Sequence, residues 1–247
     1  MGAPRVAFID IETAPIDALV WGLFEQNVIH VIEPTFILSY AIQWIGEKKI
    51  TTRALCDYPG YAKDKKSDKA ICADLWADLD RADIICAHNG DNFDLKKINS
   101  RLVVHGFPPP SPYKQIDTLK ICRRVFKFDS NKLDNVAQYL GVGSKLAHTG
   151  KNLWLGCMAG DLKAWRIMKR YNSMDIVLLR GVYEKIKSWD KSHPSLTTYD
   201  DKPGCPTCRS SSVQARGFNV AKTRKTQRMH CQGCGAWYSG AIIKKVA

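Results

Sequence analysis

The stretch Phe8-Ile-Asp-Ile-Glu-Thr13 constrains the fold of this chain most strongly, because it sets two acids into an apolar strand. Residues 5–11 have the apolar run expected of a buried strand, interrupted by Asp10 and followed by Glu12. Positions i and i+2 of a strand point to the same face, so both carboxylates lie side by side at the strand end. Burying two like charges is costly without a cation, and hard oxygen ligands suit magnesium or manganese. Taken alone, the two acids also fit a solvated strand end without a metal. The other residues of the chain decide between a metal site and a solvated strand end.

The remaining pattern of apolar residues predicts an α/β fold with a mixed five-stranded sheet and flanking helices. Strands are expected over residues 5–11, 35–45, 48–56, 83–87 and around 116–118, the first three forming an antiparallel meander. Helices are expected over residues 70–79, 94–105, 118–127, 132–140 and 161–187, the last as two helices with a bend. Segments 14–30 and 145–154 are predicted to lack regular secondary structure. In the helix that starts at Asp94, the inner face is predicted to hold Leu95, Ile98, Leu102 and Val103.

Two more acids fall where they can face the same site. Asp94 lies where strand 83–87 turns into a helix, a place where a carboxylate also caps free backbone N–H groups, so capping is its alternative role. Asp175 and Tyr171 are four residues apart and share one helix face. A core-facing carboxylate is rare without a partner, although a buried Tyr–Asp pair could be purely structural.

Together these residues predict a metal site. Four converging carboxylates, Asp10, Glu12, Asp94 and Asp175, would be prohibitive without metal. Two Mg²⁺ or Mn²⁺ ions about 3.5–4 Å apart would neutralise them and form an arrangement that cleaves phosphodiesters. The hydroxyl of Tyr171, one helical turn before Asp175, is placed to hold the attacking water.

Three segments in this order resemble the motifs of the DEDD, or DnaQ-like, 3′–5′ exonucleases of the ribonuclease H-like superfamily. Phe8–Thr13 resembles the first motif, His88–Asp94 the second, and Tyr171–Asp175 the third in the Tyr-x-x-x-Asp form of the tyrosine subgroup. The resemblance covers roughly residues 4–188 and implies a ribonuclease H-like fold and a metal-dependent 3′–5′ exonuclease. The catalytic residues that it implies are Asp10, Glu12, Asp94, Tyr171 and Asp175.

Two positions near these motifs are ambiguous. Asp91 precedes Asp94 and is the alternative acid of the second motif. We favour Asp94, because it follows an aromatic residue, as in the family pattern. Asp117 is equally compatible with a supporting acid and with a cap at a strand end.

Four cysteines near the C-terminus predict a second metal site. Cys205-Pro-Thr-Cys208 and Cys231-Gln-Gly-Cys234 are two Cys-x-x-Cys knuckles separated by 22 residues. This spacing suits one structural Zn²⁺ held by four thiolates, and the segment resembles a zinc ribbon. A disulfide pair or a redox motif is the alternative, but a redox Cys-x-x-Cys is normally single. We therefore expect a nuclease domain over residues 1–188, a polar linker over 189–204 and a zinc ribbon over 205–247.

Charge points to a polyanionic partner. The chain has a formal net charge of +13, and residues 205–247 hold eight Lys or Arg and no Asp or Glu. Basic residues near aromatic ones suit contact with a nucleic-acid backbone and stacking on bases. The alternative is a structural ribbon whose aromatics form its own small core. The candidate nucleic-acid-binding residues are Arg216, Lys222, Arg224, Lys225 and Arg228.

These features predict an intracellular, cytoplasmic exonuclease acting on nucleic acid, with single-stranded DNA favoured and RNA as the other candidate. Its N-terminus lacks a signal-peptide pattern, and no apolar run is long enough to span a membrane, so no membrane partner is expected. Replication or repair proteins are further candidate partners. Two other functions stay open: a structure-specific endonuclease of the same fold, and a non-catalytic nucleic-acid-binding adaptor, against which the complete set of acids argues.

Overall fold

Strand β1 (Val6–Thr13) is the middle strand of a five-stranded sheet in the order β5-β4-β1-β6-β7. In this computed structural model, which describes residues 2–24, 27–147, 149–200 and 202–245, β1 pairs antiparallel with β4 (Ile37–Trp44), and β4 pairs antiparallel with β5 (Thr51–Ala54). On its other side β1 pairs parallel with β6 (Ile84–Ala87), which pairs parallel with β7 (Lys114–Asp117). The predicted meander and the mixed five-stranded sheet are confirmed.

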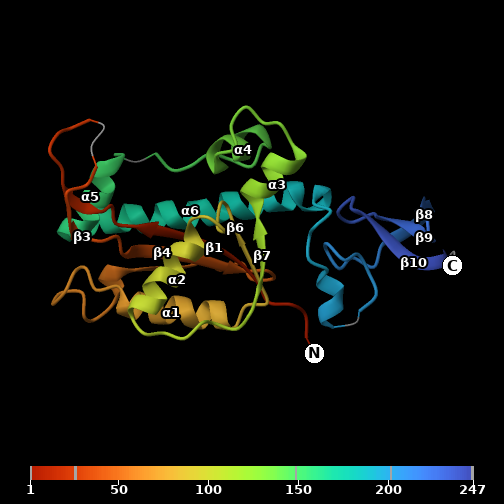
Figure 1. The fold of residues 1–247 in the computed structure, drawn as a ribbon, viewed down its shortest axis with the longest axis horizontal. Coiled ribbons are helices and arrows are strands. Elements are labelled where there is room, and N and C mark those ends of the chain that lie inside the picture. Colours follow the sequence, from red (N-terminus) through yellow and green to blue (C-terminus); the bar gives the residue numbers. More distant parts are fainter. Residues whose placement is uncertain (1, 25–26, 148, 201, 246–247) are drawn as a thin grey trace.

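Helices cover both faces of this sheet (Figure 1). One face carries α1 (Lys69–Asp80) and α2 (Asp94–Val104). The other carries α3 (Thr118–Val125), α4 (Leu133–Tyr139) and α6 (Leu162–Ile186), and α6 crosses β5, β4 and β1. Helix α5 (Lys151–Ala159) packs against α6. The described residues also contain the short 3₁₀ helices η1 (Leu55–Asp57), η2 (Lys187–Trp189) and η3 (Leu196–Tyr199).

The period of β1 decides which face of the sheet carries its acids. Odd residues 7–11 pack into the core under α1 and α2. Phe8 packs into the opposite core, where its ring meets that of Tyr183 on α6 edge-on at 5.2 Å. Asp10 and Glu12 continue the Phe8 face, because side chains alternate along a strand. The α6 side of the sheet therefore changes from apolar packing to carboxylates within two residues.

Segment 14–30, predicted as irregular, contains regular structure. Strands β2 (Asp17–Leu19) and β3 (His30–Glu33) form a separate two-stranded antiparallel sheet. They are three and four residues long, too short to show a period in the sequence.

Three predictions about helices were wrong in part. Val103 is 71% exposed, because it lies one residue past Leu102 and so turns out of the apolar stripe on α2. The second half of the predicted loop 145–154 is the start of α5, and α6 runs as one helix of 25 residues without the predicted division. Gly181, within α6, marks close packing: a Cβ there would lie 2.3 Å from the Val142 side chain.

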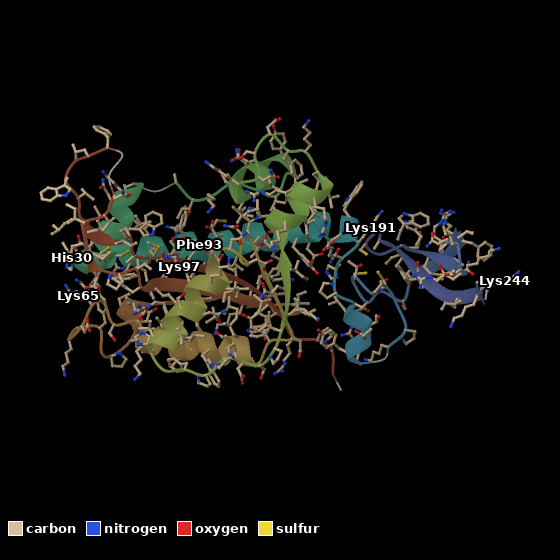
Figure 2. All side chains as sticks on the ribbon, viewed as in Figure 1. His30, Lys65, Phe93, Lys97, Lys191 and Lys244 are labelled. Atoms are coloured by element: carbon tan, nitrogen blue, oxygen red, sulfur yellow. The ribbon has the colours of Figure 1, made fainter. Side chains whose placement is uncertain are left out.

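The C-terminal region forms a three-stranded antiparallel ribbon in the order β10-β9-β8, as expected for a ribbon with four clustered cysteines. Its strands are β8 (Val213–Val220), β9 (Arg224–Cys231) and β10 (Trp237–Lys245). Figure 2 shows Lys191 beside the end of α6 and Lys244 at the far end of the ribbon.

The segment predicted as a linker, residues 189–204, packs onto the core. Leu196 is buried in the cluster that contains Tyr183, and the Tyr183 hydroxyl lies 2.8 Å from His193 Nε2. Residue 201 of this segment and residues 246–247 of the ribbon lie outside the described residues. The domain boundaries at 188 and 205 stay predictions.

None of the helices in the described part of the chain combines the length and apolar character that a membrane span requires.

Asp68 is the most completely paired buried acid on the α1–α2 side. Its carboxylate is fully buried and accepts two hydrogen bonds from the Arg101 guanidinium, both at 2.7 Å. It also accepts the backbone N–H of Ile37 at 2.9 Å and lies 2.5 Å from His105 Nε2. This acid therefore ties α2 and the start of α1 to strand β4.

We expect Asp68→Ala to lower the free energy of unfolding by about 3–5 kcal/mol, because it leaves the Arg101 charge without its partner in a poorly solvated place. Urea denaturation measures this loss. The matched control is Glu184→Ala, which removes the half-exposed partner of Lys187 and should cost about 0–1 kcal/mol. Equal losses in the two variants would contradict the structural role of Asp68.

Candidate active site

Three of the four predicted carboxylates share one spot. Oxygens of Asp10, Glu12 and Asp175 all lie within 4.8 Å of one another, a spacing at which one cation can bind all three. Strand β1 supplies the first two and the middle of α6 supplies the third. The Asn172 amide donates to the Asp10 carboxylate at 2.6 Å, and the Ser39 hydroxyl donates to the Asn172 carbonyl at 3.2 Å, so α6 is held in register with β1 and β4.

Asp94 lies next to this cluster and is 3% exposed. Its carboxylate accepts the backbone N–H of Ile11, the residue between the two acids of β1, at 3.1 Å. Asp94 is the first residue of α2, and the residue in the capping position is Phe93, whose side chain makes no capping hydrogen bond. Its position beside β1 therefore favours the predicted site role over simple capping.

The two ambiguous acids are not part of the group formed by Asp10, Glu12 and Asp175, and each has other partners. Asp117 caps α3 by accepting the backbone N–H of Leu119 at 2.9 Å, and it also accepts that of Asn89 at 2.9 Å. Asp91 pairs with Lys120. The structure thus favours the capping role for Asp117. The choice of Asp94 as the acid of the second motif stays a prediction.

Lys145 is a member of the site that sequence reasoning missed. Its ammonium donates to Asp175 Oδ2 at 2.5 Å and to the Tyr171 hydroxyl at 3.0 Å, and it lies 5.0 Å from the centre of the Tyr171 ring. Burial lowers the pKa of Lys145, but Asp175 raises it by more, so the lysine stays charged. The residue stands in an irregular segment without periodicity, so the sequence held no signal for it.

Trp154 was also missed, because segment 145–154 was predicted to be a loop. The Trp154 side chain donates a hydrogen bond to Glu12, and its ring meets that of Tyr171 edge-on at 6.0 Å. Helix α5 therefore closes one side of the site.

The carboxyl groups hold their protons unusually strongly. Burial and then the neighbouring Asp94, Glu12 and Asp175 raise the pKa of Asp10 well above its ordinary value. Burial and then Asp175 raise the pKa of Glu12 from 4.5 to about 8. Burial raises the pKa of Asp94 from 3.8 to about 7, although the Ile11 N–H lowers it. One lysine is too little positive charge for four acids, and a set of oxygen donors with this excess charge fits hard divalent cations.

A cavity of about 590 Å³ opens beside Asp10 and Lys145. Its wall includes the cations Arg123 and Lys132, and its polar residues include Asn131, whose buried side-chain oxygen has no hydrogen-bond partner among the residues that the structure describes. This cavity joins the carboxylate cluster to a basic surface, as a site for a phosphate-containing chain requires.

The second predicted metal site is also assembled. The four sulfurs of Cys205, Cys208, Cys231 and Cys234 lie within 4.8 Å of one another. The Cys205–Cys234 and Cys208–Cys231 sulfur distances are 3.7 and 3.6 Å, too long for disulfide bonds at about 2.0 Å. A tetrahedron with Zn–S bonds of about 2.3 Å has edges of about 3.8 Å, so the four sulfurs fit one zinc ion.

Backbone donors support a thiolate in this cluster. Burial raises the pKa of Cys231. Hydrogen bonds, first among them those from the backbone N–H groups of Cys234 and Gly233, lower it by more, so that the pKa of this thiol is about 7. Gly233 leaves little room for a side chain, since a Cβ there would lie 2.9 Å from the Ser210 hydroxyl.

The five candidate nucleic-acid-binding residues all lie on β8, on β9 or in the turn between them. Lys225 lies 4.0 Å from the centre of the Phe218 ring, and Arg228 lies 5.3 Å from that of Trp237. Arg216, Lys222 and Arg224 are exposed. Two of these five cations thus lie over aromatic rings of the ribbon, and the nucleic-acid-binding role of the set stays a prediction.

Comparisons with known proteins agree with this fold. The model of one family, described as the RNase_H superfamily, matches residues 7–187, which include all four predicted carboxylates. Among solved structures, the family B DNA polymerase from the hyperthermophilic archaeon Pyrobaculum calidifontis is similar, with a TM-score of 0.54 at 17% sequence identity. The match covers 76% of this chain and 25% of the polymerase, so the chain spans about a quarter of that protein's length, and at this identity the likeness shows the fold alone. A comparison with curated proteins gave no match.

The raised carboxyl pKa values predict a pH-dependent stability of the protein without Mg²⁺ or Mn²⁺. Between the ordinary value of 4.5 and about 8 for Glu12, the folded state holds a proton that the unfolded state has released. The free energy of unfolding therefore falls as pH rises through this window. Asp10→Asn removes one of the repelling acids, so we expect it to melt at a higher temperature than the wild type at pH 8, with the difference vanishing near pH 4.

Thermal melts in buffer freed of Mg²⁺ and Mn²⁺, with zinc left in place, check this expectation. Asp91→Asn is the matched control, since Asp91 lies outside the cluster, and its melting temperature should follow that of the wild type at both pH values. Addition of Mn²⁺ should then stabilise the wild type more than Asp10→Asn. Parallel melting curves for Asp10→Asn and the wild type at all pH values would contradict the repulsion.

The sulfur geometry predicts one zinc ion per chain, measured by elemental analysis. Cys208→Ser removes one of four thiolates and should lower the zinc retained after dialysis against a competing chelator. Cys56→Ser is the matched control, because this cysteine is far from the cluster in the fold and should leave zinc retention unchanged. A wild-type protein that holds no zinc, or equal retention in both variants, would refute the site.

Proposed function

Since the chain belongs to the RNase_H superfamily, we propose that it is a metal-dependent nuclease, and more narrowly a 3′–5′ exonuclease of the tyrosine subgroup of DEDD enzymes. One observation carries this proposal: three carboxylates within 4.8 Å of one another, beside a cavity with cationic walls. The ribonuclease H-like fold supports nucleic-acid hydrolysis in general. The order of the three motifs along the chain supports the narrower assignment.

The proposed metal ligands are Asp10, Glu12, Asp94 and Asp175. Divalent cations bound there would make a bound water acidic and offset the negative charge of the phosphate. The protein's own part is to hold the ligands in place. Asn172 holds Asp10, the Ile11 N–H holds Asp94, and Trp154 holds Glu12. These three carboxylates are thus each oriented by a donor from a helix or a strand.

Tyr171 is proposed to orient the attacking water. Burial and then Asp175 raise the pKa of its hydroxyl to about 12, so it is protonated at neutral pH and does not serve as a base. Lys145 lines the same cavity as Asp10, and we assign it to a phosphate oxygen of the bound strand. Such a contact would add a cation to the neutralisation of the developing charge.

Single-stranded DNA is the proposed preferred substrate, with RNA as the alternative. The zinc ribbon is proposed to hold the substrate through Arg216, Lys222, Arg224, Lys225 and Arg228. Cationic side chains beside aromatic rings support this role. Cleavage of nucleic acid would serve in replication or in repair, and replication or repair proteins are the proposed partners. The intracellular location proposed for the protein suits either process.

The test is a cleavage assay with Mg²⁺ or Mn²⁺ on single strands of DNA and RNA. A strand labelled at its 5′ end should shorten in steps, whereas circular strands and strands with a blocked 3′ end should stay intact. Asp175→Asn should lower the rate by at least about a thousandfold, because it removes one ligand charge at the site.

The control is Asp134→Asn, which changes a carboxylate in the cavity wall outside the metal cluster and should retain most activity. Cleavage of circular strands would point to the endonuclease alternative. Binding without any cleavage by the wild type would point to the adaptor.

A further inference from the structure

Four aromatic rings form a continuous row on the α3–α4 side of the molecule. The row runs from Trp189 in η2 through Phe126 and Phe128 in the α3–α4 connection to Tyr139 at the end of α4. Successive ring centres are 5.6, 5.2 and 6.1 Å apart. We call these four residues the aromatic row.

The two ends of the aromatic row face solvent. Trp189 is 60% exposed and Tyr139 is 59% exposed, whereas Phe126 and Phe128 are half-buried against the core beneath. The Tyr139 hydroxyl donates to the Asp129 carboxylate, which holds the ring in place. Because the four rings are contiguous and both ends are exposed, the aromatic row offers apolar ring surface to a ligand with flat apolar groups.

Cations border the aromatic row. Residues 120–132 hold five Lys or Arg against one acid, Asp129. Arg123, Lys127 and Lys132 are exposed, and within the described part of the chain no carboxylate lies at ion-pair distance from them. Flat aromatic faces beside cations without ion-pair partners match the chemistry of nucleotides, whose bases stack and whose phosphates are anionic.

The aromatic row is continuous with the candidate active site. Arg123 and Lys132 flank the segment that carries Phe126 and Phe128, and both line the cavity that contains Asp10 and Lys145. At one end of the row, Trp189 lies just after α6, and Figure 2 shows nearby Lys191 beside the end of α6 that is nearer the ribbon. A strand leaving the cavity therefore meets this surface before it can reach the ribbon.

We propose that the aromatic row is a binding track for single-stranded nucleic acid outside the cleavage cavity. Bases stack on the exposed faces of Trp189 and Tyr139, and Arg123, Lys127 and Lys132 hold the phosphates. The track links the cavity to the ribbon, so one long strand binds to all three. This inference rests on the proposed nuclease function for the identity of the ligand, and its test is independent of cleavage.

The test measures binding of fluorescent oligothymidylate strands in the Asp175→Asn background without divalent metal. One small single-strand-binding module covers about 4–16 nucleotides. A strand of about 5 nucleotides lies at the lower end of that range, and one of about 25 nucleotides exceeds it. Stacking contributes about 1–3 kcal/mol per base, so the loss of two rings in the double variant Trp189→Ala and Tyr139→Ala should weaken binding of the long strand at least about thirtyfold. Binding of the short strand to the cavity should change little.

Three controls separate stacking from a loss of structure. Trp21→Ala removes a tryptophan that is 86% exposed on the connection between β2 and β3, and it should not change the affinity. Trp189→Phe and Tyr139→Phe keep flat rings and should restore most of the binding. Lys127→Ala, which leaves the rings intact, should reduce the slope of log affinity against log salt by about 0.7.

Unchanged long-strand affinity in the double alanine variant would overturn the track and leave the aromatic row to a protein partner. If the double phenylalanine variant binds as weakly as the double alanine variant, stacking is also refuted. Cleavage is scored separately with the wild type. If binding depends on the rings but the wild type cleaves nothing, the track is retained and the nuclease function is rejected. If the wild type cleaves but binding does not depend on the rings, the nuclease function is retained and the track is rejected.

Discussion

Repulsion among buried carboxylates is the constraint on which the rest of this structure depends. Asp10, Glu12 and Asp94 are held together where burial favours their protonated forms, and Asp175 beside them contacts the ammonium of Lys145. Such a site tends to expand, because like charges repel strongly where water is scarce. A rigid surrounding structure keeps it closed, and relief of that repulsion would add to the affinity for the divalent cations proposed to bind there.

The rigidity comes from packing of α6 across the sheet. Tyr183 meets Phe8 in the apolar core, and two to three helical turns earlier Asp175 and Asn172 stand over the acids of β1. Because one helix carries both the apolar anchor and the site residues, a shift of α6 would disturb both at once. The segment after α6 extends this support, with Leu196 in the same core and the ribbon beyond it.

Local sequence patterns were sufficient to predict those parts of the structure that depend on residues close together in sequence. The period of β1 predicted that Asp10 and Glu12 share a face, and the two Cys-x-x-Cys knuckles predicted a four-sulfur cluster. Short elements were harder, since β2 and β3 have too few residues for a period. The start of α5 was missed for a related reason, because its first turn follows an irregular, glycine-containing segment.

The sequence by itself determined the α/β architecture with its antiparallel meander of three strands, the shared face of the acids of β1 and the spacing of the cysteines, because each depends on a local pattern along the chain. Tertiary structure alone decided that Lys145 contacts Asp175, that Asp117 caps a helix and that four rings from three segments form one row. These contacts join residues far apart in sequence, and no periodicity records them. Their positions follow only once α3, α4 and α6 have packed together on one face of the sheet.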